Sequence, residues 1–108
     1  MAKILASDSD ARIIVAGDFN EFVFVSPVEN FEAISNLRNL DDAANIPTLE
    51  QYTYMYDMNN QEIDHVFISQ ALKPKAQFEH VHINTWATLA DQISDHDPSV
   101  AKLNVCSK

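Results

Sequence analysis

The chain has 108 residues, which is enough for one small domain. Hydrophobic residues make up 46% of it, so a buried core is expected, and no apolar run approaches the roughly 20 residues that a membrane-spanning helix needs. Acidic residues outnumber basic ones by 16 to 7, and the formal net charge of −9 argues against a protein that holds nucleic acid through lysine and arginine alone.

The first predicted element is a strand over residues 12–16, where a short apolar run precedes Gly17 and Asp18. An uninterrupted apolar run of this length is typical of a strand that is buried on both faces. Gly17 is the only glycine in the chain, so we expect it to occupy a specific turn where its conformational freedom is needed.

A helix is predicted over residues 27–37. Ser26, Pro27 and Glu29 follow the pattern of a capping box, with serine at the N-cap and proline in the first turn. Apolar residues then recur at helical spacing along one face. Residues 41–48 are expected to form a loop with room for one helical turn.

Strands dominate the remaining sequence. Residues 51–56 carry the three tyrosines on one face, residues 57–60 have the composition of a turn, and residues 62–69 are predicted to form the second strand of a hairpin. Residues 78–84 and 99–105 are two further predicted strands. The resulting order, one strand, one helix and then four strands, is typical of the α/β or α+β class.

Residues 17–20, with the sequence GDFN, are the first segment that carries chemistry. Ligands of open α/β sheets bind beyond the carboxyl ends of the strands. There a carboxylate such as Asp18 can orient or deprotonate a water, and a carboxamide such as Asn20 can donate to a phosphate oxygen. The alternative is a plain Asp/Asn turn that ends a strand.

Two later segments place ionisable groups in unusual surroundings. Asp64 lies within an otherwise apolar strand, and a carboxylate there needs a partner unless it faces solvent. Residues 94–98, with the sequence SDHDP, put Asp95 beside His96, a pair that can serve a metal and a phosphate or form an acid–base unit. The alternative is a polar turn before a strand that begins with proline.

His80 and His82 share one face of the predicted strand over residues 78–84. Their spacing could bind a metal, but no third ligand is visible nearby, so a structural role is expected. Trp86 and the three tyrosines are expected to pack or to face the substrate, rather than to form a dedicated platform for stacking bases.

Taken in order, the three chemical segments resemble the endonuclease/exonuclease/phosphatase (deoxyribonuclease-like) superfamily. The C-terminal half of that family carries GD-x-N, then I-D-x before an apolar residue, then S-D-H-x-P, and all three patterns are present here. Residues 17–22, 52–54 and 95–100 look especially like the large extracellular nucleases of bacteria and related secreted fungal proteins. The resemblance covers residues 13–105.

The resemblance implies a role for each matching residue. Asp18 would orient or deprotonate the attacking water and contact the metal, and Asn20 would hold a non-bridging phosphate oxygen. Asp95 would be a metal ligand and His96 would contact the scissile phosphate. Asp64 would accept a hydrogen bond from the His96 ring and so fix its tautomer. The implied cofactor is Mg²⁺ or Mn²⁺, with Ca²⁺ as a further candidate.

The resemblance also implies a fold. Residues 1–108 would be a single partial domain, the C-terminal half of a four-layer α/β sandwich, with a mostly antiparallel or mixed sheet and one main helix. The family's N-terminal half supplies an Asn and the Glu that holds the principal metal, and no motif here matches them. One sheet face would then need cover from that missing half or from a homo-oligomer, and whether the chain is active alone is left open.

The leading hypothesis is therefore metal-dependent phosphodiester hydrolysis by a nuclease, an endonuclease that takes DNA or RNA as its substrate. One alternative keeps the fold and replaces the substrate with a phospholipid or inositol phosphate. Another is a non-catalytic fragment or interaction module that retains the motifs by descent. Residues 1–7 have no long apolar run, so no signal peptide is expected, while the resemblance points to an extracellular, secreted protein.

Overall fold

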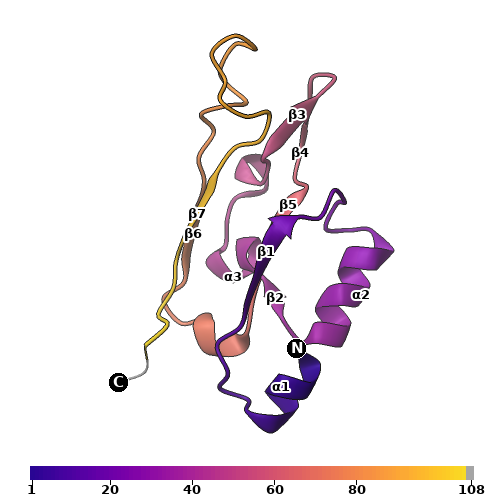
Figure 1. Ribbon diagram of the computed structural model, residues 1–108, viewed down its shortest axis with the longest axis vertical. Helices are drawn as coiled ribbons and strands as arrows, with labels where there is room; N and C mark the ends of the chain where they lie inside the picture. The colour runs from indigo at the N-terminus through magenta and orange to yellow at the C-terminus, as the bar shows by residue number, and fades with distance from the viewer. Residues whose placement is uncertain (107–108) are drawn as a thin grey trace.

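A three-stranded sheet with the order β1-β5-β2 lies at the centre of the computed structural model, which describes residues 1–106 (Figure 1). The central strand β5 (Asp64–Ile68) pairs on one side with β1 (Ile14–Asp18) and on the other with β2 (Arg38–Asn39). Both pairings are antiparallel. β5 is the strand around which the rest of the chain packs.

Each face of β5 carries its own apolar core, because successive side chains of a strand point to opposite faces. On one face Phe67 is fully buried and packs with side chains of α2 (Ser26–Ser35). On the other face Ile68 is fully buried against α3 (Leu40–Ala44) and β6 (Gln77–His80). The sheet is thus covered by a helix on one side and by the α3–β6 segment on the other (Figure 1).

The remaining elements are two antiparallel hairpins and three short helical segments. They are β3 (Tyr54–Tyr56) with β4 (Asn59–Gln61), β6 with β7 (Ser99–Lys102), α1 (Ala2–Ser7), and the 3₁₀ turns η1 (Thr48–Glu50) and η2 (Gln70–Leu72). The β3–β4 hairpin and the long loop between β6 and β7 reach one end of the elongated molecule (Figure 1). The N-terminus and the C-terminal end of β7 lie towards the opposite end.

The structure confirms the coarse fold expected from the sequence, a small mixed α/β domain with mostly antiparallel sheets. The predicted main helix is α2, the longest of the described helices at 10 residues. The helical turn allowed within residues 41–48 is α3, and the last two predicted strands are β6 and β7, both shorter than expected. Helix α1 has no counterpart among the predicted elements.

The predicted capping box of the main helix is wrong. The N-cap is Val25, and Ser26 already lies inside the helix, where no side-chain cap bond forms. Pro27 keeps its place in the first turn, where its missing N–H has no intrahelical partner to lose. The helix ends at Ser35, two residues earlier than predicted, and the next residue, Asn36, adopts a left-handed conformation with φ of 58°.

The predicted hairpin between residues 51–56 and 62–69 is also wrong. Asp57 and Met58 both have positive φ, the conformation of a tight two-residue hairpin turn, and this turn pairs β3 with β4 instead. The predicted second strand is β5, which pairs with β1 and β2 in the central sheet. Its two buried faces fit a central position, whereas a partner in an exposed hairpin would leave Phe67 in water.

Two expectations about the first strand are also overturned. β1 is an edge strand with β5 as its one partner, and it is not buried on both faces, since Ile14 is 49% exposed. Gly17 lies within the strand, has no positive φ, and a Cβ atom there would meet nothing within 4 Å. The left-handed residue falls at Asn20 instead, with φ of 51°, a conformation that asparagine tolerates better than most residues.

Candidate functional site

The register of the central sheet brings two predicted site residues together. Asp18 at the end of β1 lies directly opposite Asp64 at the start of β5. An isolated antiparallel β-bridge between Tyr54 and His96 holds the loop before β7 near these two aspartates. As a result, one ligand atom from each of Asp18, Asp64 and His96 lies within 4.8 Å of the other two. Three segments far apart in the sequence therefore converge on one cluster.

The contact predicted between His96 and Asp64 is present. The Nδ1–H of His96 donates to Asp64 Oδ2 at 2.6 Å, which leaves Nε2 as the ring nitrogen that can meet a substrate. The same carboxylate oxygen accepts a second hydrogen bond, at 2.5 Å, from the hydroxyl of the fully buried Thr53. Asp64 is therefore fixed from the interior while it orients the histidine ring.

The electrostatic surroundings favour a charged imidazole at His96. Burial by itself lowers the pKa of His96, but the hydrogen bond with Asp64 and the negative charges of Asp64, Asp18 and Asp95 outweigh it, so the pKa is raised above the usual 6.5. The protonated ring is a donor at both nitrogens, and its Nε2–H can contact a phosphate oxygen. The pKa of His96 is higher in the folded than in the unfolded chain, so protonation of His96 stabilises the fold. This stabilisation is complete below the unfolded-state pKa and is lost as the pH rises through the folded-state pKa.

We expect Asp64→Asn to lower the pKa of His96, because the variant removes the hydrogen-bonded negative charge while it keeps the side chain's shape. Titration of the His96 ring by NMR measures the change. Asp57→Asn is the matched control, since Asp57 is exposed in the β3–β4 turn and is expected to leave the titration unchanged. An identical His96 titration in wild type and Asp64→Asn would contradict the assigned interaction.

The loop that follows β1 is anchored to β5. The N–H of Phe19 donates to the carbonyl of Ile63 at 2.9 Å, and Nε2 of the buried His65 donates to the carbonyl of Glu21 at 2.8 Å. Within the loop, the backbone N–H of Asn20 donates to Asp18 Oδ1 at 2.7 Å. The side chains of Asp18 and Asn20 are thereby held at the exposed end of the sheet.

Asp95, the predicted metal ligand, lies on the surface immediately before His96. It is not one of the three residues whose ligand atoms cluster within 4.8 Å, although its charge contributes to the raised pKa of His96. Of the five predicted site residues, the structure thus joins Asp18, Asp64 and His96 directly. It places Asn20 and Asp95 beside them in the chain.

Asp97 is a residue of the site that sequence reasoning missed. Its buried carboxylate accepts hydrogen bonds from the backbone and hydroxyl of Thr85, the backbone of Asn84 and the ring of His82. Burial raises the pKa of Asp97, but these hydrogen bonds outweigh burial and hold it below its usual range. Its own N–H donates to the carbonyl of Thr53 at 2.6 Å. These hydrogen bonds fix Asp97, and with it the backbone on the C-terminal side of His96.

His80 at the end of β6 and His82 just after it both have partners within the fold. His80 Nε2 donates to Asp41 at 2.8 Å, and the hydroxyl of Ser99 lies 2.8 Å from its other ring nitrogen. The ring of His82 stacks on Tyr52, with centroids 3.8 Å apart and planes only 5° from parallel. The only sequence signal for these contacts was the i, i+2 spacing of His80 and His82, and this spacing does not predict which residues they contact.

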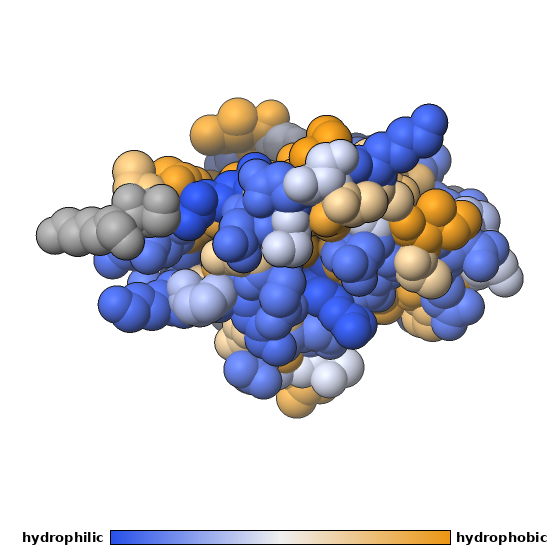
Figure 2. All heavy atoms as spheres, turned by 90° about the horizontal axis from the view of Figure 1, so that it is seen from below, coloured by the Kyte–Doolittle hydropathy of each residue, from blue (hydrophilic) through white to orange (hydrophobic). Residues whose placement is uncertain are grey.

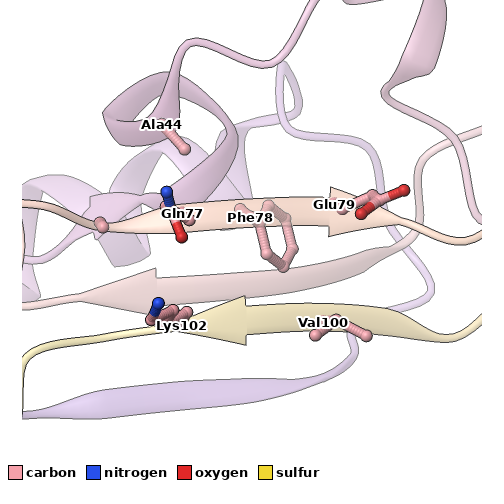
Figure 3. A pocket seen from close by; sticks show the side chains of 7 residues that line it. Ala44, Gln77, Phe78, Glu79, Val100 and Lys102 are labelled. Carbon is pink, nitrogen blue, oxygen red and sulfur yellow. The ribbon is translucent and has the colours of Figure 1, made fainter.

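A hollow of about 530 Å³ lies beside β6, β7 and the end of α3 (Figure 3). Phe78 and Val100 contribute apolar surface to it, and Gln77, Glu79 and Lys102 add polar groups. No residue of the Asp18–Asp64–His96 cluster lines this hollow. The hollow and the candidate site are therefore separate features.

No family model, curated protein or solved structure matches this chain. Within residues 1–106, none of the helices combines the length and the apolar character that crossing a membrane requires.

Proposed function

We propose that this chain carries the reacting groups of a metal-dependent phosphodiesterase. The observation that supports this most strongly is the convergence of Asp18, Asp64 and His96, which come from the three segments that the motif resemblance assigns to catalysis. Nothing in the local sequence requires these segments to meet. Plain polar turns at the same positions would have no reason to place an aspartate-bound histidine beside a second carboxylate.

The residues of the cluster fit a divalent cation such as Mg²⁺ or Mn²⁺, with Ca²⁺ as a further candidate, because carboxylate oxygens suit these ions. Asp64 Oδ2 is already bonded to Thr53 and His96, so Asp18 is the residue of the cluster that would hold the ion. The motif resemblance adds the exposed Asp95, which lies outside the cluster, as a second ligand. When bound, the ion supplies Lewis-acid polarisation of the phosphate. It also offsets the repulsion between the facing carboxylates of Asp18 and Asp64.

The remaining chemistry is assigned to the side chains themselves. Asp18 orients the attacking water and accepts its proton, and the carboxamide of Asn20 donates to a non-bridging phosphate oxygen. His96 donates from Nε2 to the phosphate and stabilises the charge that develops there, while Asp64 holds the ring by Nδ1. The raised pKa of His96 suits this task, since the donating form is the protonated ring.

We also propose that this fold is the C-terminal half of a four-layer α/β sandwich, with the open side of β1 covered by an N-terminal half or by a second copy. The exposed Ile14 and the unpaired edge of β1 support this proposal. A nuclease acting on DNA or RNA, and a secreted location, rest on the motif resemblance alone. A phospholipid substrate is the second candidate. The exposed apolar side chains of the β6–β7 loop, which contains His96, support it.

Hydrolysis of bis(4-nitrophenyl) phosphate, a small soluble phosphodiester, tests the proposed chemistry. With Mn²⁺ we expect release of nitrophenol above the protein-free rate, abolished by EDTA and lowered about 100-fold or more by Asp18→Asn. Asp42→Asn, an exposed carboxylate on α3 outside the cluster, is the matched control with an expected wild-type rate.

Two results would contradict the proposal. One is hydrolysis that survives EDTA or is unaffected by Asp18→Asn. The other is a folded chain that neither hydrolyses this substrate nor binds dimethyl phosphate in the presence of Mn²⁺. Binding without turnover would support the view that the remaining reacting groups come from a second segment or a second copy.

A further inference from the structure

Large apolar side chains are concentrated on the loop between β6 and β7. Ile83, Trp86, Leu89 and Ile93 all lie on this loop, and their exposed fractions run from 56% to 93%. Trp86 is 78% exposed even though its ring N–H donates to the hydroxyl of Tyr52. A soluble surface rarely gathers so many large apolar side chains on one loop without a binding function.

The β3–β4 hairpin adds to the same end of the molecule. Its Tyr56 and Met58 are 63% and 94% exposed, and the hairpin lies beside the β6–β7 loop in the ribbon view (Figure 1). The bridge between Tyr54 and His96 ties hairpin and loop together next to the candidate site. We call this surface the apolar tip, defined by Tyr56, Met58, Ile83, Trp86, Leu89 and Ile93.

Basic residues are absent from the sequence around the apolar tip. None of the seven lysines and arginines falls within residues 39–72 or 76–101, the two stretches that hold the tip. Lys73, Lys75 and Lys102 instead belong to the end of the molecule where β7 finishes. That opposite end, seen from below, presents a surface on which hydrophilic side chains surround several smaller apolar patches (Figure 2). The apolar tip therefore has no lysine or arginine in its own segments, although other exposed apolar side chains lie elsewhere on the surface.

The absence of lysine and arginine from the tip decides between its possible occupants. Nucleic acid binds through lysine and arginine that neutralise phosphates, and the tip supplies neither. An N-terminal half that covers the open side of β1 would lie along that sheet edge, whereas the tip belongs to the β3–β4 hairpin and the β6–β7 loop. Acidic side chains at Asp57, Asp91 and Asp95 would repel an anionic lipid surface. A neutral, zwitterionic lipid surface meets none of these objections.

We propose that the apolar tip docks on a zwitterionic lipid surface and so presents the site to the phosphodiester of a phospholipid headgroup. Tryptophan and tyrosine favour the interface between lipid and water, and aliphatic side chains beside them enter the acyl region. His96 lies in the same β6–β7 loop, three residues after Ile93, so docking of the apolar tip would place its ring at headgroup level. The choice of substrate rests on the proposed phosphodiesterase function, whereas the docking does not.

Vesicle binding tests the docking directly, and the chain carries its own reporter because Trp86 is the only tryptophan. With phosphatidylcholine vesicles we expect a blue shift of the Trp86 emission and co-sedimentation of the protein. Both should be weaker with phosphatidylglycerol vesicles. The double variant Leu89→Ser/Ile93→Ser is expected to lower the vesicle partition coefficient about tenfold or more, since two large apolar side chains no longer leave water.

The matched control is Ile4→Ser/Ile34→Ser, which removes two exposed isoleucines from α1 and α2, away from the tip, and should leave the partition coefficient unchanged. Equal losses in both double variants, no blue shift on phosphatidylcholine, or tighter binding to duplex DNA than to vesicles would overturn the proposal. Light scattering without vesicles must also show no tip-dependent dimer, because a dimer lost in Leu89→Ser/Ile93→Ser would assign the tip to a second copy.

Failure of docking and failure of the proposed function give different results. The tip variant should hydrolyse bis(4-nitrophenyl) phosphate at the wild-type rate, since that substrate needs no lipid surface. If vesicles bind but the soluble phosphodiester is not hydrolysed, the docking surface stands and the catalytic proposal fails. If the soluble phosphodiester is hydrolysed but vesicles do not bind, the catalytic proposal stands and the lipid surface is wrong.

Discussion

Replacing His96 by alanine is expected to lower the rate of metal-dependent phosphodiester hydrolysis by about 100- to 10,000-fold, the usual contribution of a positioned proton donor. The loss follows from the geometry, because no second side chain in the described cluster has a donor in place of the ring Nε2. Initial rates with bis(4-nitrophenyl) phosphate and Mn²⁺ measure the effect.

The fold of His96→Ala should be intact, because the side chain of His96 is 27% exposed and belongs to neither apolar core. Thermal melting checks this. Added imidazole should restore part of the activity of His96→Ala, which a merely structural defect would not allow. A rate within threefold of wild type, in a folded variant, would remove His96 from the mechanism.

The largest expected loss of stability comes from the buried pair of His80 and Asp41. Both side chains are at least 97% buried, and their atoms lie 2.8 Å apart. We expect His80→Ala to lower the free energy of unfolding by about 3–5 kcal/mol, because it leaves a buried carboxylate without its partner. The other oxygen of Asp41, Oδ2, already has no hydrogen-bond partner within the described chain. Urea unfolding gives the value.

Asp42→Ala is the matched control for this pair. Asp42 is the next residue of α3 but is exposed, so its replacement should change the free energy of unfolding by less than about 0.5 kcal/mol. The double variant Asp41→Ala/His80→Ala should lose less than the sum of the single losses, since the two residues share one interaction. If His80→Ala lowered the free energy of unfolding by less than about 1 kcal/mol, the pair of His80 and Asp41 would not be a major source of stability.

Part of the fold was predictable from local sequence. The helix found at Ser26–Ser35 was predicted over residues 27–37, because apolar spacing and a proline in the first turn act over a few residues. The partner of β5 was not predictable in this way, because β1 lies about 50 residues earlier and the pairing is decided by burial of Phe67 and Ile68. The two-residue turn at Asp57 and Met58 instead pairs β3 with β4, where the sequence had predicted that β5 would be the second strand of the hairpin.

Prediction of the candidate site likewise succeeded for short local motifs and failed for contacts between distant residues. Asp18, Asp64 and His96 were predicted because they match short motifs of the superfamily that the sequence resembles, and the structure places these three side chains together. Thr53 and Asp97 were missed because their importance lies in hydrogen bonds to distant residues, which no short pattern encodes. The prediction for Gly17 failed for a related reason, since composition singled it out while the strained conformation fell at Asn20.

Titration of the ¹⁵N-labelled chain with Mn²⁺ tests whether this cluster is a metal site, whatever the chain's activity, because the paramagnetic ion broadens NMR signals of nearby nuclei. The proposed site predicts that the amide signals of Asp18, Asp64, Asp95 and His96 lose intensity first, with excess Mg²⁺ restoring them. Equal broadening at exposed acidic residues elsewhere, such as Asp42 and Asp57, or first broadening away from the end of β1, would contradict a metal-assisted site at this cluster.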